Sequence, residues 1–571
     1  MGKTHVVEYL VVFFYFMFMI ITGIVFRRFN QNFNDYFRSG CRGTWWLVGA
    51  SIFMASFTAW TFTGAAGVAY ESGISVAIIF IANGLGYLLN YLCTAARFRQ
   101  LRAITGPEII KNRFDTTTQQ FYIWVGIIPG ILMSSLTLWG TAVFTAAIFG
   151  FNLSILIVIL GLVVLIYSTL GGIWSVMATD FLQALILMPM TILVAYLSLQ
   201  SIGGWSHLVA EVHRQQLPDL LHFIDTRNGS MFTPGYMIAM VCFVLISYNS
   251  LGSSVKYFAC KDGREAKKAA ALASLLMFMG VVLWFIPPMV AKLQFAGLVD
   301  TQHISKPADA AYAVISMQLL ANGLSGMIVV AMFAATMSSL SPQLNQYAAI
   351  ITQDIYRPFI RKTATEKEIF IVGQIASIFV GILIILSALY LSRTQGKGLF
   401  EYMMKFGSLF GTPMLIPMFI SLFIRRTPVW SAIFSICCSA IVSFCGWKFA
   451  WSYERTVFTI LIIGSISYLL TIPFWKYAKS EYQNKVRRFY QGMNTPVDFE
   501  QEVGQANDPS QLKLVGYVSL AIGLFVALLL LVPNPLGGRL QILFVSGCIS
   551  LFGMSMIYTG KRRERKQTNS V

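Results

Sequence analysis

The stretch GLSGMIVVAMFAATMSSLSPQLNQYAAIITQDIY, residues 323–356, decides the fold of this chain. It begins as an apolar helix long enough to enter a membrane and then turns into a band of hydroxyl and amide side chains. On the 3.6-residue period of an α-helix, the small and polar side chains of this band share one face. The residues on that face are Ala335, Ser338, Ser339, Ser341 and Asn345. The pattern predicts a membrane helix that presents oxygen ligands on one side.

Pro342 adds a second source of oxygen to the same helix. Because proline has no N–H, the carbonyl of Ser338, four residues earlier, loses its helical partner and is free to bind something else. Hydroxyls and freed carbonyls suit a hard cation such as Na⁺. Small polar residues also let two membrane helices pack closely, and that explanation stays open for any single serine. It accounts less well for the whole run of Ser, Pro, Asn and Asp.

The composition is that of a polytopic membrane protein. The chain has 571 residues, of which 56% are hydrophobic and 12% charged, and it contains many apolar runs of about 20 residues. The net charge of +18 does not indicate nucleic-acid binding, because the basic residues form short clusters between apolar spans. We therefore expect the bilayer to surround most of the chain, and we expect no nucleic-acid partner.

Hydropathy predicts about fifteen transmembrane helices. Every second connection is basic, and Lys256 to Lys268 and Arg97 to Arg113 are two of these clusters. By the positive-inside rule, this alternation places the N-terminus outside and the C-terminus in the cytoplasm, as an odd number of crossings requires. The predicted spans are 8–27, 44–70, 72–95, 120–148, 152–177, 179–199, 232–258, 267–296, 309–355, 366–392, 398–424, 428–448, 455–475, 512–532 and 537–559.

Two of these spans are interrupted by small and polar residues in corresponding places, at 51–64 and 247–254. Each interrupted span opens a block of five spans. If the two blocks are inverted repeats, the broken helices face each other at the middle of the bilayer, where unwound carbonyls can hold an ion and a polar solute. The alternative is a pair of glycine and serine kinks that serve packing only.

A third polar segment, YSTLGGIWSVMATDFLQ at 167–183, carries Asp180 and Gln183 among apolar neighbours. An acidic residue near the membrane interior is a candidate for ion handling. Asp180 is equally compatible with a cap at the start of the next helix. The sequence leaves both interpretations open.

Three motifs together resemble the sodium:solute symporter family. AATMSSLSPQLN followed by TQDIY is similar to the family signature, YSTLGGIWSVMATDFLQ to a second family block, and the Gly-Leu-x-Gly at 323–326 to a third. The resemblance runs from about residue 8 to 478 in the family's order. It implies an all-α, five-plus-five inverted-repeat (LeuT-like) core with additional N- and C-terminal helices. It also implies secondary active transport driven by a sodium gradient.

The resemblance also implies site residues. The sodium site would consist of the backbone carbonyls of Met54, Phe57 and Ala335 with the hydroxyls of Ser338 and Ser339. The solute would lie beside it, on the two broken helices. The candidate solute-binding residues are Ser56, Thr58, Trp60, Thr61, Tyr248 and Asn249.

Two departures from the family pattern limit what can be carried over. Some members use the equivalent of Asp180, with hydroxyls beyond the serine pair, for a second sodium; here Ser341 is present but Pro342 follows it. A possible second-ion or gating role therefore stays open for Asp180 and Ser341. The polar and acidic side chains that grip sugar hydroxyls in glucose-type members are absent, which favours a smaller or amphipathic solute over a hexose.

The expected function is sodium-coupled import of a small organic solute by alternating access, with Na⁺ as the coupling ion, in the plasma (inner) membrane. A proton-coupled symporter, with Asp180 as the titrating carboxylate, and a transporter-like solute sensor are the alternatives. An enzyme is not expected, because no Ser/His/Asp set or metal-ligating His cluster lies on the spans. The sequence predicts neither the solute nor the oligomeric state.

The resemblance and the hydropathy together divide the chain into seven parts. They are an N-terminal extra helix and loop (1–43), the first repeat (44–199), an extracellular loop (200–231), the second repeat (232–424), additional helices (425–478), a cytoplasmic loop (479–511), and a C-terminal hairpin with a basic tail (512–571).

Overall fold

The structure of the protein is a computed structural model that describes residues 6–27, 41–103, 105–170, 173–224, 232–302, 306–393, 399–504 and 508–568. These residues form helices, with one isolated bridge between Gly43 and Cys260 and no other strand pairing among them. The prediction of an all-α chain is confirmed. The sequence Asn228-Gly-Ser230, which has the pattern of an N-glycosylation acceptor, lies outside the described residues.

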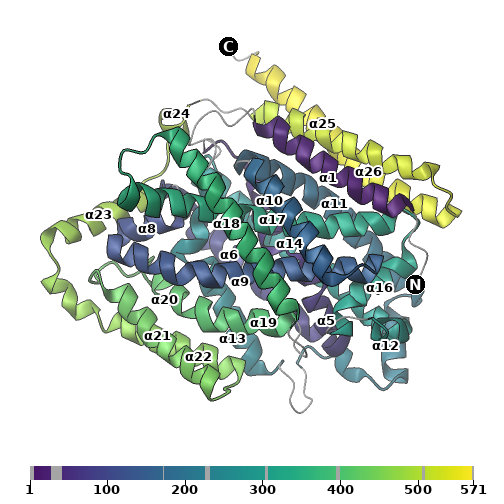
Figure 1. Cartoon of the computed structure of the whole chain (residues 1–571), viewed down its shortest axis with the longest axis horizontal. Coiled ribbons are helices and arrows are strands. Elements are labelled where there is room, and N and C mark those ends of the chain that lie inside the picture. Colours follow the sequence, from purple (N-terminus) through teal and green to yellow (C-terminus); the bar gives the residue numbers. More distant parts are fainter. Residues whose placement is uncertain are drawn as a thin grey trace.

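Figure 1 shows the arrangement of the helices. Their bounds are α1 Val6–Arg27, α3 Trp45–Ser56, α4 Ala59–Phe62, α5 Gly64–Ser72, η2 Gly73–Val76, α6 Ala77–Leu89, η3 Asn90–Thr94, α7 Ala95–Gln100, α8 Gly106–Arg113, α9 Thr116–Phe149, α10 Leu153–Leu170, α11 Ile173–Ser201, α12 Trp205–Arg214, η4 Pro218–Leu221, α13 Pro234–Tyr248, η5 Leu251–Ala259, α14 Gly263–Gln294, α15 Ala296–Asp300, η6 Pro307–Ala310, α16 Ala311–Leu319, α17 Leu324–Ala349, η7 Ile350–Ile360, α18 Glu366–Ser392, α19 Leu399–Phe406, η8 Gly407–Gly411, α20 Thr412–Ile420, α21 Ser431–Lys448, α22 Tyr453–Leu469, η9 Ile472–Tyr477, α23 Ser480–Asn494, α24 Phe499–Glu502, α25 Asp508–Ala527, η10 Leu528–Leu531 and α26 Leu536–Thr568.

Many of these helices are long and apolar enough to cross a membrane. Within the described residues there are 11 such helices, or 12 if the bent pair α13 and η5 is counted as one span. Three shorter apolar helices accompany them, at Val6–Phe18, Trp45–Ser56 and Leu153–Ile166. These are segments where the sequence predicts further spans, but they are too short to count by length alone. The total of about fifteen stays a prediction.

Both interrupted spans are broken where the sequence predicts. In the first, α3 ends at Ser56 because Phe57 has extended backbone angles, φ −98° and ψ 107°, and the chain resumes as α4 and α5. In the second, α13 ends at Tyr248 and η5 leaves it at an angle of 53°. Small and polar residues at both breaks tolerate the loss of helical hydrogen bonds, because their side chains can replace some of the missing partners.

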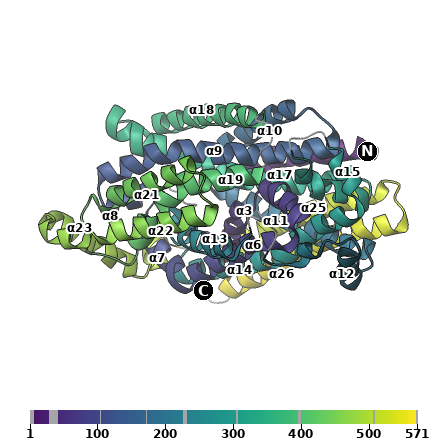
Figure 2. The ribbon, with the colours of Figure 1, turned by 90° about the horizontal axis from the view of Figure 1, so that it is seen from below.

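Helix α17 is the buried centre of the bundle. Its most apolar 18-residue window is wholly buried, and it packs against α1, α3, α9, α10, α11 and α18. Figure 2 shows α18, α10 and α9 on one side of it. The helix continues through Pro342 and then changes to a π-helix, η7. The hydroxyl band is therefore enclosed by protein on all sides.

The N-terminal helix α1 is anchored to α17 through a close approach at Gly326. A Cβ at this position would lie 2.9 Å from the Glu8 carbonyl oxygen, so a side chain there would force the two helices apart. The buried carboxylate of Glu8 also accepts a hydrogen bond of 3.0 Å from the Gly323 N–H. The hairpin of α25 and α26 lies along α1 (Figure 1).

The segment 479–511, predicted as a polar loop, begins with helix α23, which packs against α7 and α8. Its anchor is Arg113, the last residue of α8, whose side chain is fully buried. The Arg113 guanidinium donates hydrogen bonds to the hydroxyls of Tyr482 (2.9 Å) and Tyr490 (3.1 Å) on α23. The prediction that Arg113 belongs to a basic loop cluster that marks topology is wrong, because its side chain is fully buried and links two elements inside the protein.

The connection 200–231 packs on the end of the first broken span. Gly73 has φ +64°, and a Cβ there would lie 2.0 Å from the carbonyl oxygen of Leu220 in η4. Nearby, the Ser75 hydroxyl donates a hydrogen bond of 2.9 Å to the His222 carbonyl. The part of this connection around η4 is thus fixed to η2.

Replacing Gly73 by alanine is expected to lower the melting temperature of the purified protein. The substitution costs about 1–3 kcal/mol for the positive φ alone, and the clash with the Leu220 backbone adds to it. Gly297→Ala is the matched control, since a Cβ at Gly297 meets nothing within 4 Å. Equal melting temperatures for the two variants would contradict the packing of η4 on Gly73.

Candidate functional site

The predicted sodium ligands lie on two helices that touch each other. Met54 and Phe57 are at the C-terminal end of α3, next to its break, and Ala335, Ser338 and Ser339 are in the middle of α17. All five residues are buried, and α3 packs against α17. The structure therefore brings the two parts of the predicted site into neighbouring elements at the centre of the bundle.

The break in α3 frees backbone oxygens at this point. The helical partner of the Phe57 carbonyl would be the N–H of Thr61, which instead bonds to the Thr58 carbonyl at 2.9 Å. The partner of the Met54 carbonyl would be the N–H of Thr58, which is outside the helix. A broken membrane helix with freed carbonyls is a common way to coordinate a small cation.

On α17, the serine hydroxyls are also available for a ligand. The Ser338 and Ser341 hydroxyls are buried and make no hydrogen bond within the part of the chain that the structure describes. The Ser339 hydroxyl donates to the Thr336 carbonyl at 2.9 Å, which leaves its own oxygen lone pairs unused. Buried hydroxyls without partners are costly unless something binds them, and a cation satisfies them.

Asp180 connects the two helices of the predicted site. Its carboxylate is 1% exposed, accepts a hydrogen bond from the Ser51 hydroxyl on α3, and lies near the Ser338 hydroxyl on α17 without a hydrogen bond to it. Helix α11 begins at Ile173, so Asp180 lies two turns inside it and does not cap it. The capping interpretation is therefore wrong, and Asp180 belongs to the candidate site.

Lys256 is a member of this cluster that the sequence analysis missed. Its ammonium group donates to the Ser51 carbonyl (2.8 Å) and the Ser51 hydroxyl (2.9 Å), and lies 3.6 Å from a carboxylate oxygen of Asp180. Its place in a basic cluster of the sequence predicts a loop residue, but its position inside the predicted span 232–258 indicates a buried one. A lysine inside an apolar span has a buried partner as a rule.

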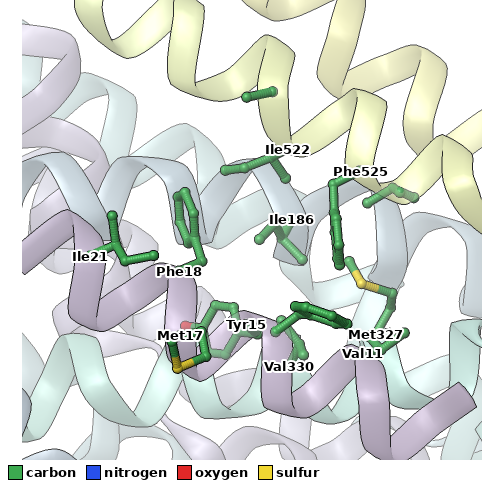
Figure 3. A pocket seen from close by; sticks show the side chains of 13 residues that line it. Val11, Tyr15, Met17, Phe18, Ile21, Ile186, Met327, Val330, Ile522 and Phe525 are labelled. Carbon is green, nitrogen blue, oxygen red and sulfur yellow. The ribbon is translucent and has the colours of Figure 1, made fainter.

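Gln183, the second polar residue of the segment 167–183, links the candidate site to the N-terminal helix α1. Its amide donates to the Tyr15 hydroxyl at 3.1 Å, and that hydroxyl contacts the sulfur of Met337 at 3.9 Å. Tyr15 also lines an apolar pocket of about 270 Å³ between α1, α11, α17 and α25, shown in Figure 3. The other side chains that line this pocket are apolar, so it is not a site for a polar solute.

Among the predicted solute residues, Ser56 and Tyr248 are joined through a third residue, Tyr87 of α6. The Ser56 hydroxyl hydrogen-bonds to the Tyr87 hydroxyl, and the Tyr87 ring stacks on Tyr248 with 4.5 Å between ring centroids. These contacts connect the two broken helices. Thr58 and Trp60 are half-buried beside the first break, and Thr61 is buried with no hydrogen bond to its hydroxyl within the described residues.

Asn249, by contrast, has its side chain occupied by protein. Its amide nitrogen donates to the carbonyls of Leu245 (2.9 Å) and Gly86 (3.2 Å), while its oxygen accepts from Asn90 (2.9 Å) and Thr94 (2.7 Å). The residue is fully buried and fixes the break of the second span to η3. Its contact with a solute stays a prediction.

The sequence analysis also missed Tyr87, Asn90 and Thr94. They lie in the predicted span 72–95, and Asn90 and Thr94 begin and end the π-helical turn η3. Polar residues around a π-helical turn are a frequent mark of a functional segment. That signal was present in the sequence as NGLGYLLNYLCT but is weak without the structure.

Comparisons with known proteins show the family of the chain. Residues 36–438 match the sodium:solute symporter family. The chain is 26% identical over 462 residues to the "Sodium/glucose cotransporter 4" of Mus musculus, covering 74% of this chain and 66% of that protein. It is 28% identical over 452 residues to the "Sodium/myo-inositol cotransporter 2" of Mus musculus, covering 72% and 66%. The chain thus spans 66% of the length of these two relatives.

Two solved structures share the fold. A Na⁺-coupled sialic acid symporter in a substrate-bound outward-open state has a TM-score of 0.68 and 21% identity, covering 81% of this chain and 98% of that one. A transporter of the nucleobase-cation-symport-1 family has a TM-score of 0.54 and 15% identity, covering 80% and 99%. At these identities the likeness establishes the fold alone.

The fold, with its two broken helices and a buried polar centre, is the LeuT-like fold of multi-pass membrane proteins. Within that class, the match over residues 36–438 identifies it further. The chain belongs to the sodium:solute symporter family.

Proposed function

We propose that the protein is a sodium-coupled secondary active symporter that imports a small organic solute. The observation that carries the proposal is the meeting of freed carbonyls at the break of α3 with the buried Ser338 hydroxyl of α17, which makes no hydrogen bond within the described residues, in a chain of this family. The coupling ion is Na⁺. Its ligands are the carbonyl oxygens of Met54, Phe57 and Ala335 and the hydroxyl oxygens of Ser338 and Ser339.

The solute binds beside the ion, between the two broken helices. Ser56, Thr58 and Thr61 offer hydroxyls, while Trp60, Tyr248 and Tyr87 offer aromatic faces, and Asn249 holds the backbone of the second break. Aromatic rings with a few hydroxyls suit a small solute with both apolar and polar parts. The sugar and polyol named for the two mouse relatives belong to those proteins, and the solute of this chain is left at the level of a small organic molecule.

The transport cycle follows from the position of the ion. Na⁺ connects the movable end of α3 to the buried α17 and so stabilises the conformation that binds solute from outside. Occlusion and opening to the cytoplasm then release both. A membrane potential of about 100 mV supplies roughly 2.3 kcal/mol per charge, enough for more than about tenfold accumulation of a neutral solute with one Na⁺.

The membrane topology is part of the proposal. Residues 44–199 and 232–424 form the two inverted repeats, and 1–43, 425–478 and 512–571 supply additional helices. The N-terminus and the connection 200–231 lie outside, and the segment 479–511 and the C-terminus lie in the cytoplasm. The protein resides in the plasma (inner) membrane.

The test is the melting temperature of the purified protein in the presence of amino acids, sugars and small carboxylates, each with Na⁺ and with K⁺ in its place. A ligand that binds only the native state raises the melting temperature. We expect Na⁺ alone to stabilise the protein, and one class of solute to stabilise it further only when Na⁺ is present. Stabilisation by solute that depends on low pH and not on Na⁺ would favour the proton-coupled alternative. Binding of solute without transport into proteoliposomes would favour a sensor.

A further inference from the structure

Lys256 occupies the kind of environment that proteins provide for a metal cation. Its ammonium group is surrounded by a backbone carbonyl, a hydroxyl and a carboxylate, contributed by Ser51 of α3 and Asp180 of α11. These oxygens come from two helices, and the lysine itself from a third element, η5, which follows the second break. The charge therefore joins three separate elements of the bundle, α3, α11 and η5.

The carboxylate at the centre of this cluster needs one positive charge. Asp180 is 1% exposed, and an unpaired carboxylate at this depth is strongly unfavourable. Ser338 of α17 lies near Asp180, and Ser341 follows one turn later on the same helix; neither hydroxyl makes a hydrogen bond within the described residues. Together these oxygens form a set that would attract a free cation if Lys256 were absent.

We propose that the Lys256 ammonium is a permanently attached cation on Asp180 that takes the place of a second coupled Na⁺. The protein then binds a single Na⁺, at the site formed by α3 and α17. This inference rests on the proposed function, because an ion stoichiometry has a role only in a sodium-coupled transporter.

Charge and geometry both favour this assignment. The Asp180 carboxylate already faces two positive charges, the Lys256 ammonium and the Na⁺ at the neighbouring site on Ser338. Another Na⁺ would add a third positive charge against one negative charge. The lysine is also attached to the chain, so it returns to Asp180 at a high effective concentration without being drawn from solution. A free Na⁺ therefore does not displace Lys256 from Asp180, and it binds there only when the lysine is removed.

The experiment is equilibrium binding of radioactive ²²Na⁺ to the purified full-length protein, which needs no knowledge of the solute. We expect one Na⁺ per chain for the wild type and two for Lys256→Met, because methionine keeps the length of the side chain and removes its charge. The double variant Lys256→Met/Asp180→Asn should return to one. Lys256→Arg, which retains the charge, should also bind one.

Lys261→Met is the matched control. Lys261 is a lysine five residues further on whose ion pair with Asp508 lies away from the site, so its removal should leave the stoichiometry at one. Two Na⁺ per wild-type chain, or one Na⁺ bound to Lys256→Met with wild-type affinity, would overturn the inference while leaving sodium coupling intact. No Na⁺ bound by the wild type would overturn the proposed function as well. The number of Na⁺ ions bound by the wild type tests the inference even if a variant fails to fold.

Discussion

Ser338→Ala is expected to raise the Na⁺ concentration needed for half-maximal thermal stabilisation of the protein by roughly 10- to 100-fold. A hydrogen-bonding group that faces a charge contributes about 1.5–3 kcal/mol, and in this structure the Ser338 hydroxyl is buried without a hydrogen bond in the described residues. Ser339→Ala should act in the same direction, because the Ser339 oxygen keeps its lone pairs while its proton is donated to Thr336. A titration of the melting temperature with NaCl, at constant ionic strength, measures the effect.

Ser325→Ala provides the matched control, since Ser325 is a buried serine on the same helix but near its beginning. It should leave the Na⁺ requirement unchanged. If Ser338→Ala and Ser339→Ala both respond to Na⁺ like the wild type, the ion is bound elsewhere and the assignment of the site to α17 is wrong.

The two broken helices could be predicted because the information is local. Runs of Ser, Thr, Asn and Gly inside apolar spans mark both breaks directly in the sequence, at 51–64 and 247–254. The same is true of α17, where small residues and the serine band lie within one continuous stretch. Hydropathy and helical period report this kind of feature well, because both depend on near neighbours only.

The contacts within the site could not be predicted, because they join residues far apart in the chain. Ser51 lies 129 residues from Asp180, and Lys256 lies 205 residues from Ser51. Charge counting treats a lysine near the end of a span as a marker of topology, and nothing local says that its side chain turns inward. The helix start at Ile173 was misplaced for a related reason, since apolar residues on both sides of Gly171 and Gly172 hide the boundary.

Arg113 is another residue whose contacts could not be predicted, because its partners are far away in the chain. Besides the two tyrosines of α23, its guanidinium donates to the Thr427 hydroxyl at 2.9 Å and to the Arg425 carbonyl at 3.1 Å. The Tyr490 hydroxyl in turn donates to the Ser421 carbonyl. One buried side chain thus connects α8, the beginning of the segment 425–478, and the segment 479–511. This link does not depend on which side of the membrane the segment 479–511 lies.

Arg113→Ala is expected to lower the free energy of unfolding by about 3–5 kcal/mol, the largest stability effect we predict. The substitution removes a large side chain from a closed space and leaves several buried oxygens without donors. Arg102→Ala is the control, because Arg102 also joins the segment 479–511, through Glu502 at 2.7 Å, but is 32% exposed. An exposed ion pair contributes at most about 1 kcal/mol, so the control should melt close to the wild type.

Limited proteolysis gives a second measurement: cleavage within 480–494 should become faster in Arg113→Ala, because α23 loses its attachment to α8. Equal stability and equal cleavage of the two variants would show that α23 is held by its other contacts and that Arg113 is not its anchor.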